Sequence, residues 1–340
     1  MNSSHQDGAV APRHVTAADV ARVAKVSQST VSLVMNSKWQ NRVSEETARR
    51  VIDTARLMRY RTNLAARNLR LGTADTVLLI VPALTNPFFA AVHAGAARVG
   101  MEQGVGLVVF PLSAEDDSGP FSAPQQAIDG VISCSVSADA VSALRAGLPL
   151  VTLDDAPSQE TPSVSMDVTG GMRQAVNHLV ELGHRRILHL RAARPAWTFT
   201  CRSAAFVSEG VARSGLTASQ VTCSFAPSDA RDRVAQVLAR ADRPTSVICD
   251  DDNLAVGVYA AAAGLGLSIP DDLSVVGFND IPIASLLHPQ LTSVRLPAEQ
   301  LGIHGMRTYL RLRQGEPVAP VSLPVHMVVR GSTGPPPVSE

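Results

Sequence analysis

Apolar residues in the longer, C-terminal part of the chain, from Thr76 onward, occur in short uninterrupted runs. Runs of about four to eight apolar residues between turn residues are typical of strands buried on both faces. Each such run is therefore predicted to form a strand. The runs lie at 77–81, 105–110, 130–133, 150–153, 187–190, 246–249 and 273–277.

Stretches with the spacing of amphipathic helices separate several of these predicted strands, for example 88–101 and 171–182. Alternation of strands and helices is the pattern of parallel sheets that are covered by helices on both faces. The strands are too numerous for one compact sheet, and 340 residues suffice for a small head and a body of two lobes. The predicted fold class is α/β, with two similar lobes.

The first part of the chain has a helical pattern, in residues 16–36. Thr16 is placed to cap a helix whose third residue is Asp19, a combination that satisfies the first free N–H groups. After Lys25 and Val26, a second short helix is predicted to cross the first closely. The residues expected on the inward faces of these two helices are Val20, Ala21, Ala24, Val31 and Val34.

A third helix is predicted to start at Ser44, with Glu45 and Glu46 in its first turn. It would close a small three-helix core. Its expected inward stripe consists of Ala48, Val51, Ile52 and Ala55.

Charge is unevenly distributed, although the net charge of the chain is zero. Residues 1–72 contain twelve basic and five acidic side chains, a net charge of +7, and the remainder contains 18 and 25, a net charge of −7. A basic head favours contact with phosphate at one end, because neutralised phosphates release counterions. This segregation argues against the alternative that the charges form only a solvated face.

The cysteines, the N-terminus and the hydropathy exclude other classes. Cysteines 134, 201, 223 and 249 are far apart and form no CxxC or Cys/His cluster, so we expect reduced thiols and no metal or cofactor. The first 14 residues lack the apolar core of a secretory signal, and no apolar run approaches the roughly 20 residues that span a bilayer. We therefore expect a cytoplasmic protein with no membrane partner.

Residues 16–36, TAADVARVAKVSQSTVSLVMN, resemble the N-terminal helix-turn-helix of the LacI family of bacterial transcriptional regulators nearly residue for residue. The resemblance implies an all-α helix-turn-helix DNA-binding head, a hinge helix and a two-lobed α/β effector domain with parallel sheets, like that of periplasmic binding proteins. It continues to about residue 332 through NPFF at 86–89, HLVELGH at 178–184, DDLSVVGFND at 271–280 and LTSV at 291–294.

The resemblance and the changes of pattern together give the expected domain boundaries. Residues 1–14 and 333–340 are expected to be a disordered lead-in and tail. The remaining expected parts are the head at 15–62, the hinge helix at 63–72 and the effector domain at 73–332, with a first lobe of residues 73–183 and 296–325 and a second lobe of residues 184–295 and 326–332.

The resemblance also implies contact of the head and the hinge helix with operator DNA. Leu69 is expected to wedge into the minor groove of a kinked duplex, the alternative being that Leu64 and Leu69 are core leucines. Leu33 replaces an arginine that many relatives carry, so it can touch a thymine methyl but cannot pair with guanine. The expected contacts are Thr16, Ser27, Gln28, Ser29, Thr30, Ser32, Leu33, Asn36, Asn63, Leu64, Arg67 and Leu69.

Ligands of parallel α/β lobes collect outside the carboxyl ends of the strands. Asp251 stands where relatives usually have asparagine, and Asn279 where sugar-binding relatives commonly have aspartate. We expect a neutral polar or weakly cationic effector, a sugar, held by Arg202, Asp251 and Asn279. Phe88 and Phe89 could stack on it or could be core residues. The expected effector-binding residues are Phe88, Phe89, Gly170, Arg202, Phe225, Asp251 and Asn279.

An acidic cluster at a strand end, residues 250–252, also fits a phosphotransfer enzyme or a phosphoacceptor. The only lysines, Lys25 and Lys38, lie in the head, so the body lacks the strand-end lysine of a phospho-aspartate receiver. No GxxxxGK[ST], GxSxG or HExxH motif is present. A periplasmic sugar-binding protein would need a signal peptide and no basic head. We therefore predict no enzyme.

The resulting prediction is a homodimeric, ligand-responsive repressor that binds a pseudo-palindromic operator. The apolar positions of the segment 299–312 could form dimer surface or core. These positions are Leu301, Ile303, Met306 and Leu310.

Overall fold

The computed structural model describes residues 15–60, 74–112, 127–136, 147–158 and 160–337. The chain divides into two units, residues 1–72 and 73–340. The hinge-helix residues that the sequence pointed to, Asn63, Leu64, Arg67 and Leu69, lie outside the described residues.

In its described residues, 15–60, the first unit is a bundle of three helices, α1 (Ala17–Ala24), α2 (Gln28–Met35) and α3 (Glu45–Leu57). Thr16 and Asp19 form the predicted capping box, and Ser27 and Ser44 cap the other two helices. The predicted inward residues of α1 and α2 are buried, as are three of the four on α3. The exception is Ile52, which is 38% exposed. It follows Val51 by about 100° around the helix and so lies outside the stripe.

The second unit contains two six-stranded sheets, one in each lobe, and every neighbouring pair of strands is parallel except β10 and β12. The first sheet, in the order β11-β5-β4-β3-β1-β2, consists of β1 (Thr76–Val81), β2 (Gly106–Pro111), β3 (Gly130–Cys134), β4 (Leu150–Leu153), β5 (Ser163–Met166) and β11 (Val321–Leu323). The second sheet, in the order β12-β10-β9-β8-β6-β7, consists of β6 (Arg186–Ala192), β7 (Thr217–Cys223), β8 (Ser246–Cys249), β9 (Ser274–Asn279), β10 (Thr292–Arg295) and β12 (His326–Val328).

All seven predicted strands are present, and the apolar runs did not reveal β5, β7, β10, β11 and β12. β7 lies at the edge of its sheet with several exposed residues, and the other four have only three or four residues each. Each of the five contains polar residues and therefore no continuous apolar run, which is why the pattern missed them.

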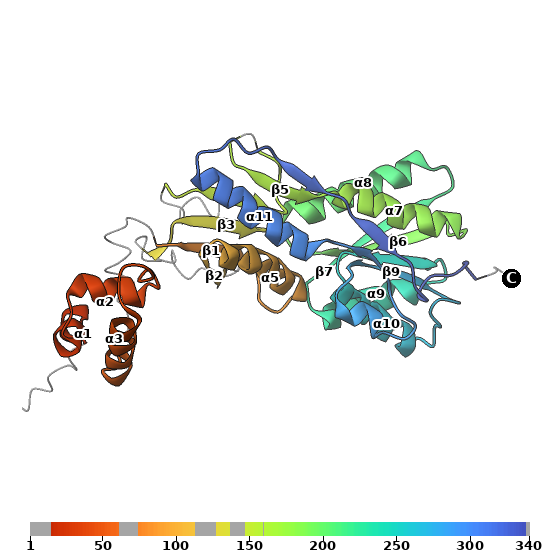
Figure 1. The fold of residues 1–340 in the computed structure, drawn as a ribbon. Coiled ribbons are helices and arrows are strands. Elements are labelled where there is room, and N and C mark those ends of the chain that lie inside the picture. Colours follow the sequence, from red (N-terminus) through yellow and green to blue (C-terminus); the bar gives the residue numbers. More distant parts are fainter. Residues whose placement is uncertain (1–14, 61–73, 113–126, 137–146, 159, 338–340) are drawn as a thin grey trace, which may run out of the picture. The chain divides into compact units, whose positions relative to one another are not determined.

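The helices cover the sheets lobe by lobe (Figure 1). In the first lobe α11 packs against α5 and against β3, β4 and β5, and in the second α9 packs on α10. Leu301, Ile303 and Met306 of α11 are buried, so this face, for which core and dimer surface were both open, forms core. The helices are α5 (Pro87–Glu102), α7 (Val168–Glu181), α8 (Trp197–Ala212), α9 (Pro227–Leu238), α10 (Asp252–Gly264), the 3-10 helix η2 (Pro282–Ser285) and α11 (Ala298–Arg313).

The helix α7 belongs to the second lobe, contrary to the expected lobe boundary after residue 183. It packs against α8, β10 and β12 (Figure 1). A Cβ atom on Gly171 would lie 2.9 Å from a methyl carbon of Val294, which shows how closely α7 approaches the second sheet. The first crossover between the lobes therefore precedes α7, because its apolar face is complementary to that sheet.

The C-terminal segment docks on the second lobe, so the expectation of a disordered tail is wrong for residues 333–337. The Thr333 hydroxyl lies 2.9 Å from Nε2 of His178, and the carbonyl oxygen of Gly334 lies 2.9 Å from Nε2 of His184. Ser332 is fully buried and donates to the carbonyl oxygen of Val275. These polar contacts hold a segment whose proline-rich composition suggests disorder. Residues 338–340 lie outside the described residues.

Candidate functional site

The carboxyl ends of the strands of both lobes open onto one cavity of about 320 Å³. Apolar and aromatic residues and polar residues line it together, so it offers both apolar walls and hydrogen-bonding groups to a small molecule. The lining residues are Pro82, Ala83, Thr85, Asn86, Phe88, Phe89, Ser135, Asp154, Arg194, Thr198, Phe199, Arg202, Phe225, Pro227, Asp251, Asn253, Asn279 and Leu296.

Six of the seven residues expected at an effector site line this cavity, and Gly170 does not. Gly170 lies in the first turn of α7, where its N–H donates to Oδ1 of Asp167. A Cβ atom there would lie 2.2 Å from Oδ2 of Asp167, so the cap itself accounts for the glycine. Gly170 is therefore the residue whose N–H the N-cap Asp167 accepts from, and it does not line the cavity.

Aromatic rings line both sides of the cavity. Phe88 and Phe89 begin α5 in the first lobe, with ring centroids 5.3 Å apart and planes nearly perpendicular. Phe88 is buried in the core of that lobe and also borders the cavity, so its core role is confirmed and its stacking on an effector stays a prediction. Phe199 and Phe225 belong to the second lobe and lie 5.8 Å apart. The cavity thus offers apolar faces to the flat side of a ring.

Arg202 of α8 is 2% exposed and is held by its own lobe. Its Nη1 donates to the carbonyl oxygen of Asp250 at 2.6 Å, and its Nη2 donates to Thr198 Oγ1 at 3.2 Å. The guanidinium also lies 4.4 Å from the ring centroid of Phe278. Its Nε has no hydrogen-bond partner, and within the described residues no carboxylate forms an ion pair with it. A buried cation with a free donor is suited to binding a polar ligand.

The three consecutive aspartates after β8 have different surroundings, and Asp250 points inward. Its carboxylate accepts from His189 Nε2 at 3.0 Å and from the Ala192 N–H at 2.9 Å. Burial acts to raise the pKa of Asp250, but His189, Arg202 and the Ala192 N–H outweigh burial and hold this pKa below its ordinary value. Asp250 is therefore a charged structural group that orients Arg202 through its carbonyl oxygen.

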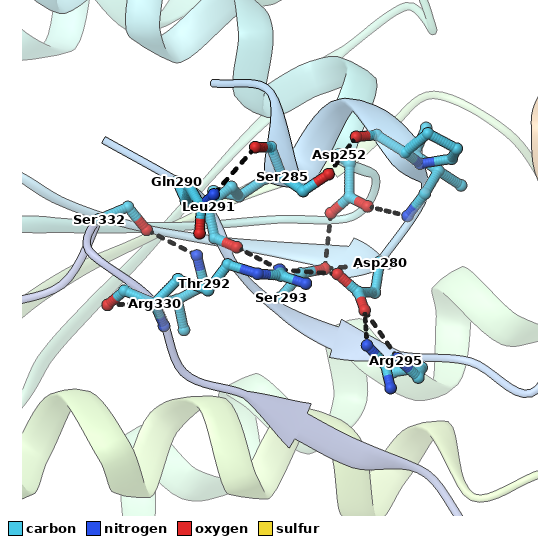
Figure 2. Close-up of polar contacts among 12 residues, drawn as sticks. Asp252, Asp280, Ser285, Gln290, Leu291, Thr292, Ser293, Arg295, Arg330 and Ser332 are labelled. Carbon is cyan, nitrogen blue, oxygen red and sulfur yellow. Dashed lines mark hydrogen bonds and ion pairs between the residues drawn. The ribbon is translucent and has the colours of Figure 1, made fainter. Parts of the chain in front are cut away.

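Asp252 also points inward, toward β10 and η2 (Figure 2). Its two oxygens accept from Ser293 Oγ at 2.6 Å and from the Ile281 N–H at 2.8 Å. Burial, aided by the charges of Asp251 and Asp280, raises the pKa of Asp252 to about 8, despite those two hydrogen bonds. Asp252 thus fastens the turn that follows β9.

The cavity residue Asn279, the last residue of β9, leads into that turn with an unusual backbone conformation. Asn279 and Asp280 have φ angles of 101° and 56°, values that L residues rarely adopt. The Asp280 carboxylate forms ion pairs with Arg295, at 2.6 Å, and Arg330, at 2.7 Å (Figure 2). These ion pairs and the Asp252 contacts hold Asn279 at the edge of the cavity.

Asp251 alone of the three aspartates lines the cavity. Burial raises its pKa, while hydrogen bonds from Asn253 and Asn86 and the charge of Arg202 limit the rise. Its Oδ2 accepts from Asn279 Nδ2 at 2.6 Å, so the carboxylate and the amide that sequence comparison placed on exchanged sides meet directly.

Asp154, which follows β4, is a cavity residue that sequence reasoning missed. It is 3% exposed, its Oδ2 accepts from Ser135 Oγ at 2.8 Å, and its Oδ1 has no partner. Burial raises the pKa of Asp154 to about 6, although the charge of Arg202 lowers it. It directly follows the apolar run 150–153, so the strand-end rule applied to the first lobe would have found it. Asn86, Arg194, Thr198 and Phe199 were missed as well.

The expected DNA contacts of the head are divided between its surface and its caps. Ser27, Gln28 and Ser29 are exposed at the start of α2, whereas Ser32 and Leu33 are half-buried. Ser27 Oγ accepts from the Thr30 N–H and lies 2.7 Å from Ser29 Oγ, so it orders the exposed turn. Asn36 caps the end of α2, and Thr16 caps the start of α1. The first turn of α2 is thus presented as a rigid polar surface.

Within the described residues, no group of three or more His, Cys, Asp or Glu side chains is arranged to hold a metal ion. No helix in the described part of the chain is long and apolar enough to cross a membrane.

Comparison with known proteins identifies the family. Residues 16–63 match the model of the lacI family of bacterial regulatory proteins, and residues 176–333 match a periplasmic binding protein-like domain. The repressor PurR of Photobacterium profundum is 30% identical over 299 residues, which cover 84% of this chain and 88% of PurR. The chain belongs to the LacI family.

Other LacI-family proteins match over similar lengths. The ribose operon repressor of Halalkalibacterium halodurans is 29% identical over 94% of this chain and 97% of its own length. A Lac repressor dimer bound to operator and an anti-inducer has a TM-score of 0.81 and 26% identity, with 95% of this chain and all of that chain covered. A LacI-family regulator from Enterococcus faecium with bound ribose has a TM-score of 0.68 and 26% identity, covering 76% of this chain and 99% of that one.

LacI-family membership confirms the predicted fold class and the prediction of a DNA-binding transcriptional regulator. Because the family consists of such regulators, the chain is not a phosphotransfer enzyme. The acidic cluster at residues 250–252 is also divided in space. Asp250 and Asp252 bond inward to His189 and Ser293, and only Asp251 of the three lines the cavity.

Proposed function

We propose that this protein is a repressor that binds a pseudo-palindromic operator as a homodimer in the cytoplasm, and that a small polar effector in the interlobe cavity changes its operator affinity. The single observation that carries the proposal is the cavity itself, because the strand ends of both lobes line it. An effector that contacts both lobes can favour one arrangement of the lobes over another. The dimeric, operator-bound Lac repressor supports the dimer and the DNA partner.

For the DNA side, the proposed reading surface is the first turn of α2. Gln28 and Ser29 are exposed there, and Ser27 stabilises the turn. Two such heads would read half-sites about one helical turn apart. The proposed contacts also include the other expected head residues and, in the hinge helix at 63–72, Asn63, Leu64, Arg67 and Leu69.

For the effector side, we propose a sugar. Arg202 and Asp154 line the cavity with a guanidinium and a carboxyl group, and a molecule rich in hydroxyl groups can hydrogen-bond to both residue types. Phe89 and Phe225 supply apolar walls, and Asn279 supplies an amide. The ribose bound to the Enterococcus faecium regulator and the cellobiose complex of the regulator CelR are precedents for this ligand class.

Selection of bound DNA from a random pool by the full-length protein tests both sides together. The expected result is an inverted repeat, with an affinity that changes when ribose, cellobiose or another sugar of a panel is added. Enrichment of no repeat would overturn the operator proposal. A response to organic acids or nucleobases alone, with no response to any sugar, would overturn the proposed effector class.

A further inference from the structure

Asn86 and Asp251 meet across the cavity from opposite lobes. Nδ2 of Asn86 donates to Oδ2 of Asp251 at 2.9 Å, although the two residues are 165 positions apart in the chain. Each is also the N-cap of a helix: Asn86 Oδ1 accepts from the Phe88 N–H at the start of α5, and Asp251 Oδ1 accepts from the Asn253 N–H at the start of α10. The N-termini of a first-lobe helix and a second-lobe helix therefore meet at one carboxylate.

The acceptor capacity of this carboxylate is filled by protein groups. Oδ1 accepts from the backbone N–H and from Nδ2 of Asn253, both at 2.8 Å, and Oδ2 accepts from Asn86 and Asn279. A carboxylate has about four lone-pair sites. Asp251 is only 1% exposed, so water does not compete for them. A ligand hydroxyl can bind Asp251 only by displacing one of these donors.

Asn86 differs from the other two asparagines because it comes from the first lobe. Asn253 and Asn279 move with Asp251, so their hydrogen bonds survive any rotation of one lobe against the other. The hydrogen bond from Asn86 is charge-assisted and breaks when the lobes separate at this point. The positive ends of the α5 and α10 helix dipoles also favour a negative charge there.

We propose that Asn86 is a positioning residue for the cavity, whose amide latches the first lobe to Asp251 of the second lobe when no ligand is bound. Asp251 is then primarily a latch, and Arg202 and Asp154 are polar cavity residues that take no part in it. This inference rests on the proposed function only for its consequence, which is that an effector has to accommodate or break the latch. The latch itself needs no effector, because both of its groups belong to the chain.

Hydrogen–deuterium exchange of the full-length, ligand-free protein tests the latch. Asn86→Ser keeps a side-chain oxygen that can cap α5 but is too short to reach Asp251. We expect exchange in residues 85–90 and 250–255 to become about tenfold or more faster, the effect of losing a hydrogen bond to a charged group. Asn253→Ala is the matched control, since it removes a donor to the same carboxylate from within the second lobe. It should leave residues 85–90 at the wild-type rate.

An exchange of the two side chains provides a second test. Asn86→Asp places two carboxylates against each other and should open the cavity further, whereas the double variant Asn86→Asp, Asp251→Asn restores one carboxylate and one amide across it. Both residue types cap helices well. We expect the double variant to recover wild-type exchange in residues 85–90.

The latch would be overturned by any of three results for the amide exchange of residues 85–90. These are a wild-type rate in Asn86→Ser, an increase in Asn253→Ala as large as in Asn86→Ser, and a rate in the double variant that stays as fast as in Asn86→Asp. No sugar is present in these measurements. A sugar screen that fails would therefore count against the proposed effector and leave the test of the latch intact.

Discussion

The carbonyl oxygen of Asp250 accepts a 2.6 Å hydrogen bond from Nη1 of Arg202 in the interior of the second lobe. A main-chain acceptor cannot change rotamer, so it fixes the direction of the guanidinium more firmly than a flexible carboxylate would. The Asp250 side chain is itself held by His189 and the Ala192 N–H. The arginine thereby reaches the cavity with its Nε unpaired.

Replacing Arg202 with lysine is expected to weaken effector binding. Lysine keeps the charge but lacks the planar guanidinium, whose two Nη atoms donate to the Asp250 carbonyl oxygen and to Thr198. Loss of one hydrogen bond from a charged group to the neutral sugar predicts at least about a tenfold weaker affinity. Titration calorimetry with the sugar found in the panel measures the effect. Arg213→Lys, at the residue that follows α8 and is paired with Glu209 outside the cavity, should bind like wild type. Equal affinity of the Arg202 and Arg213 variants would contradict the assignment.

Asp154→Asn is expected to change how stability depends on pH. The folded-state pKa of Asp154 is raised from 3.8 to about 6, so the wild type loses stability as pH rises from about 4 to about 6 and the carboxyl ionises. Asparagine cannot ionise, and over that window the variant should gain up to about 3 kcal/mol relative to wild type. Urea unfolding monitored through Trp197, which lies in the second lobe, measures the difference. If the free energies of unfolding of wild type and Asp154→Asn differ by the same amount at every pH between 4 and 7, the prediction is wrong.

Gly302→Ala is expected to destabilise the first lobe by about 1 to 3 kcal/mol, the usual range for overpacking. A Cβ atom at Gly302 would lie 1.9 Å from the carbonyl oxygen of Val92, a backbone atom of the neighbouring helix α5. Gly264→Ala, at the end of α10 with nothing within 4 Å, is the control and should stabilise by roughly 0.5 to 1 kcal/mol. Thermal unfolding of both variants checks the opposite signs.

Gln28→Ala is expected to reduce base selectivity. Gln28 is exposed in the first turn of α2, and a good base contact in the major groove contributes about 1 to 3 kcal/mol of discrimination. Fluorescence anisotropy with the selected operator and its single-base variants should show a smaller spread of affinities. Gln40→Ala, at an exposed position after α2, serves as the comparison and should keep the wild-type spread. If Gln28→Ala keeps it too, the reading turn lies elsewhere.

Local physical chemistry accounts for what the sequence by itself determined. The caps Thr16 and Ser44, the inward stripes of α1 and α2 and the seven apolar strands were correct because each depends on residues within a few positions of one another. Ile52 shows where that reasoning fails, since a stripe read loosely includes a neighbour that the helix turns outward.

Contacts between distant segments decided the rest. α7 joins the second lobe because Gly171 fits against Val294. The C-terminal segment is ordered because Thr333 and Gly334 contact His178 and His184. The hydrogen-bonding capacity of Asp251 is filled because Asn86, 165 positions away in the chain, donates to it. The sequence marks which residues can bond or pack, because side-chain chemistry and periodicity are local. Only the tertiary structure pairs them, because each pairing depends on which distant surfaces come together when the two sheets close around the cavity.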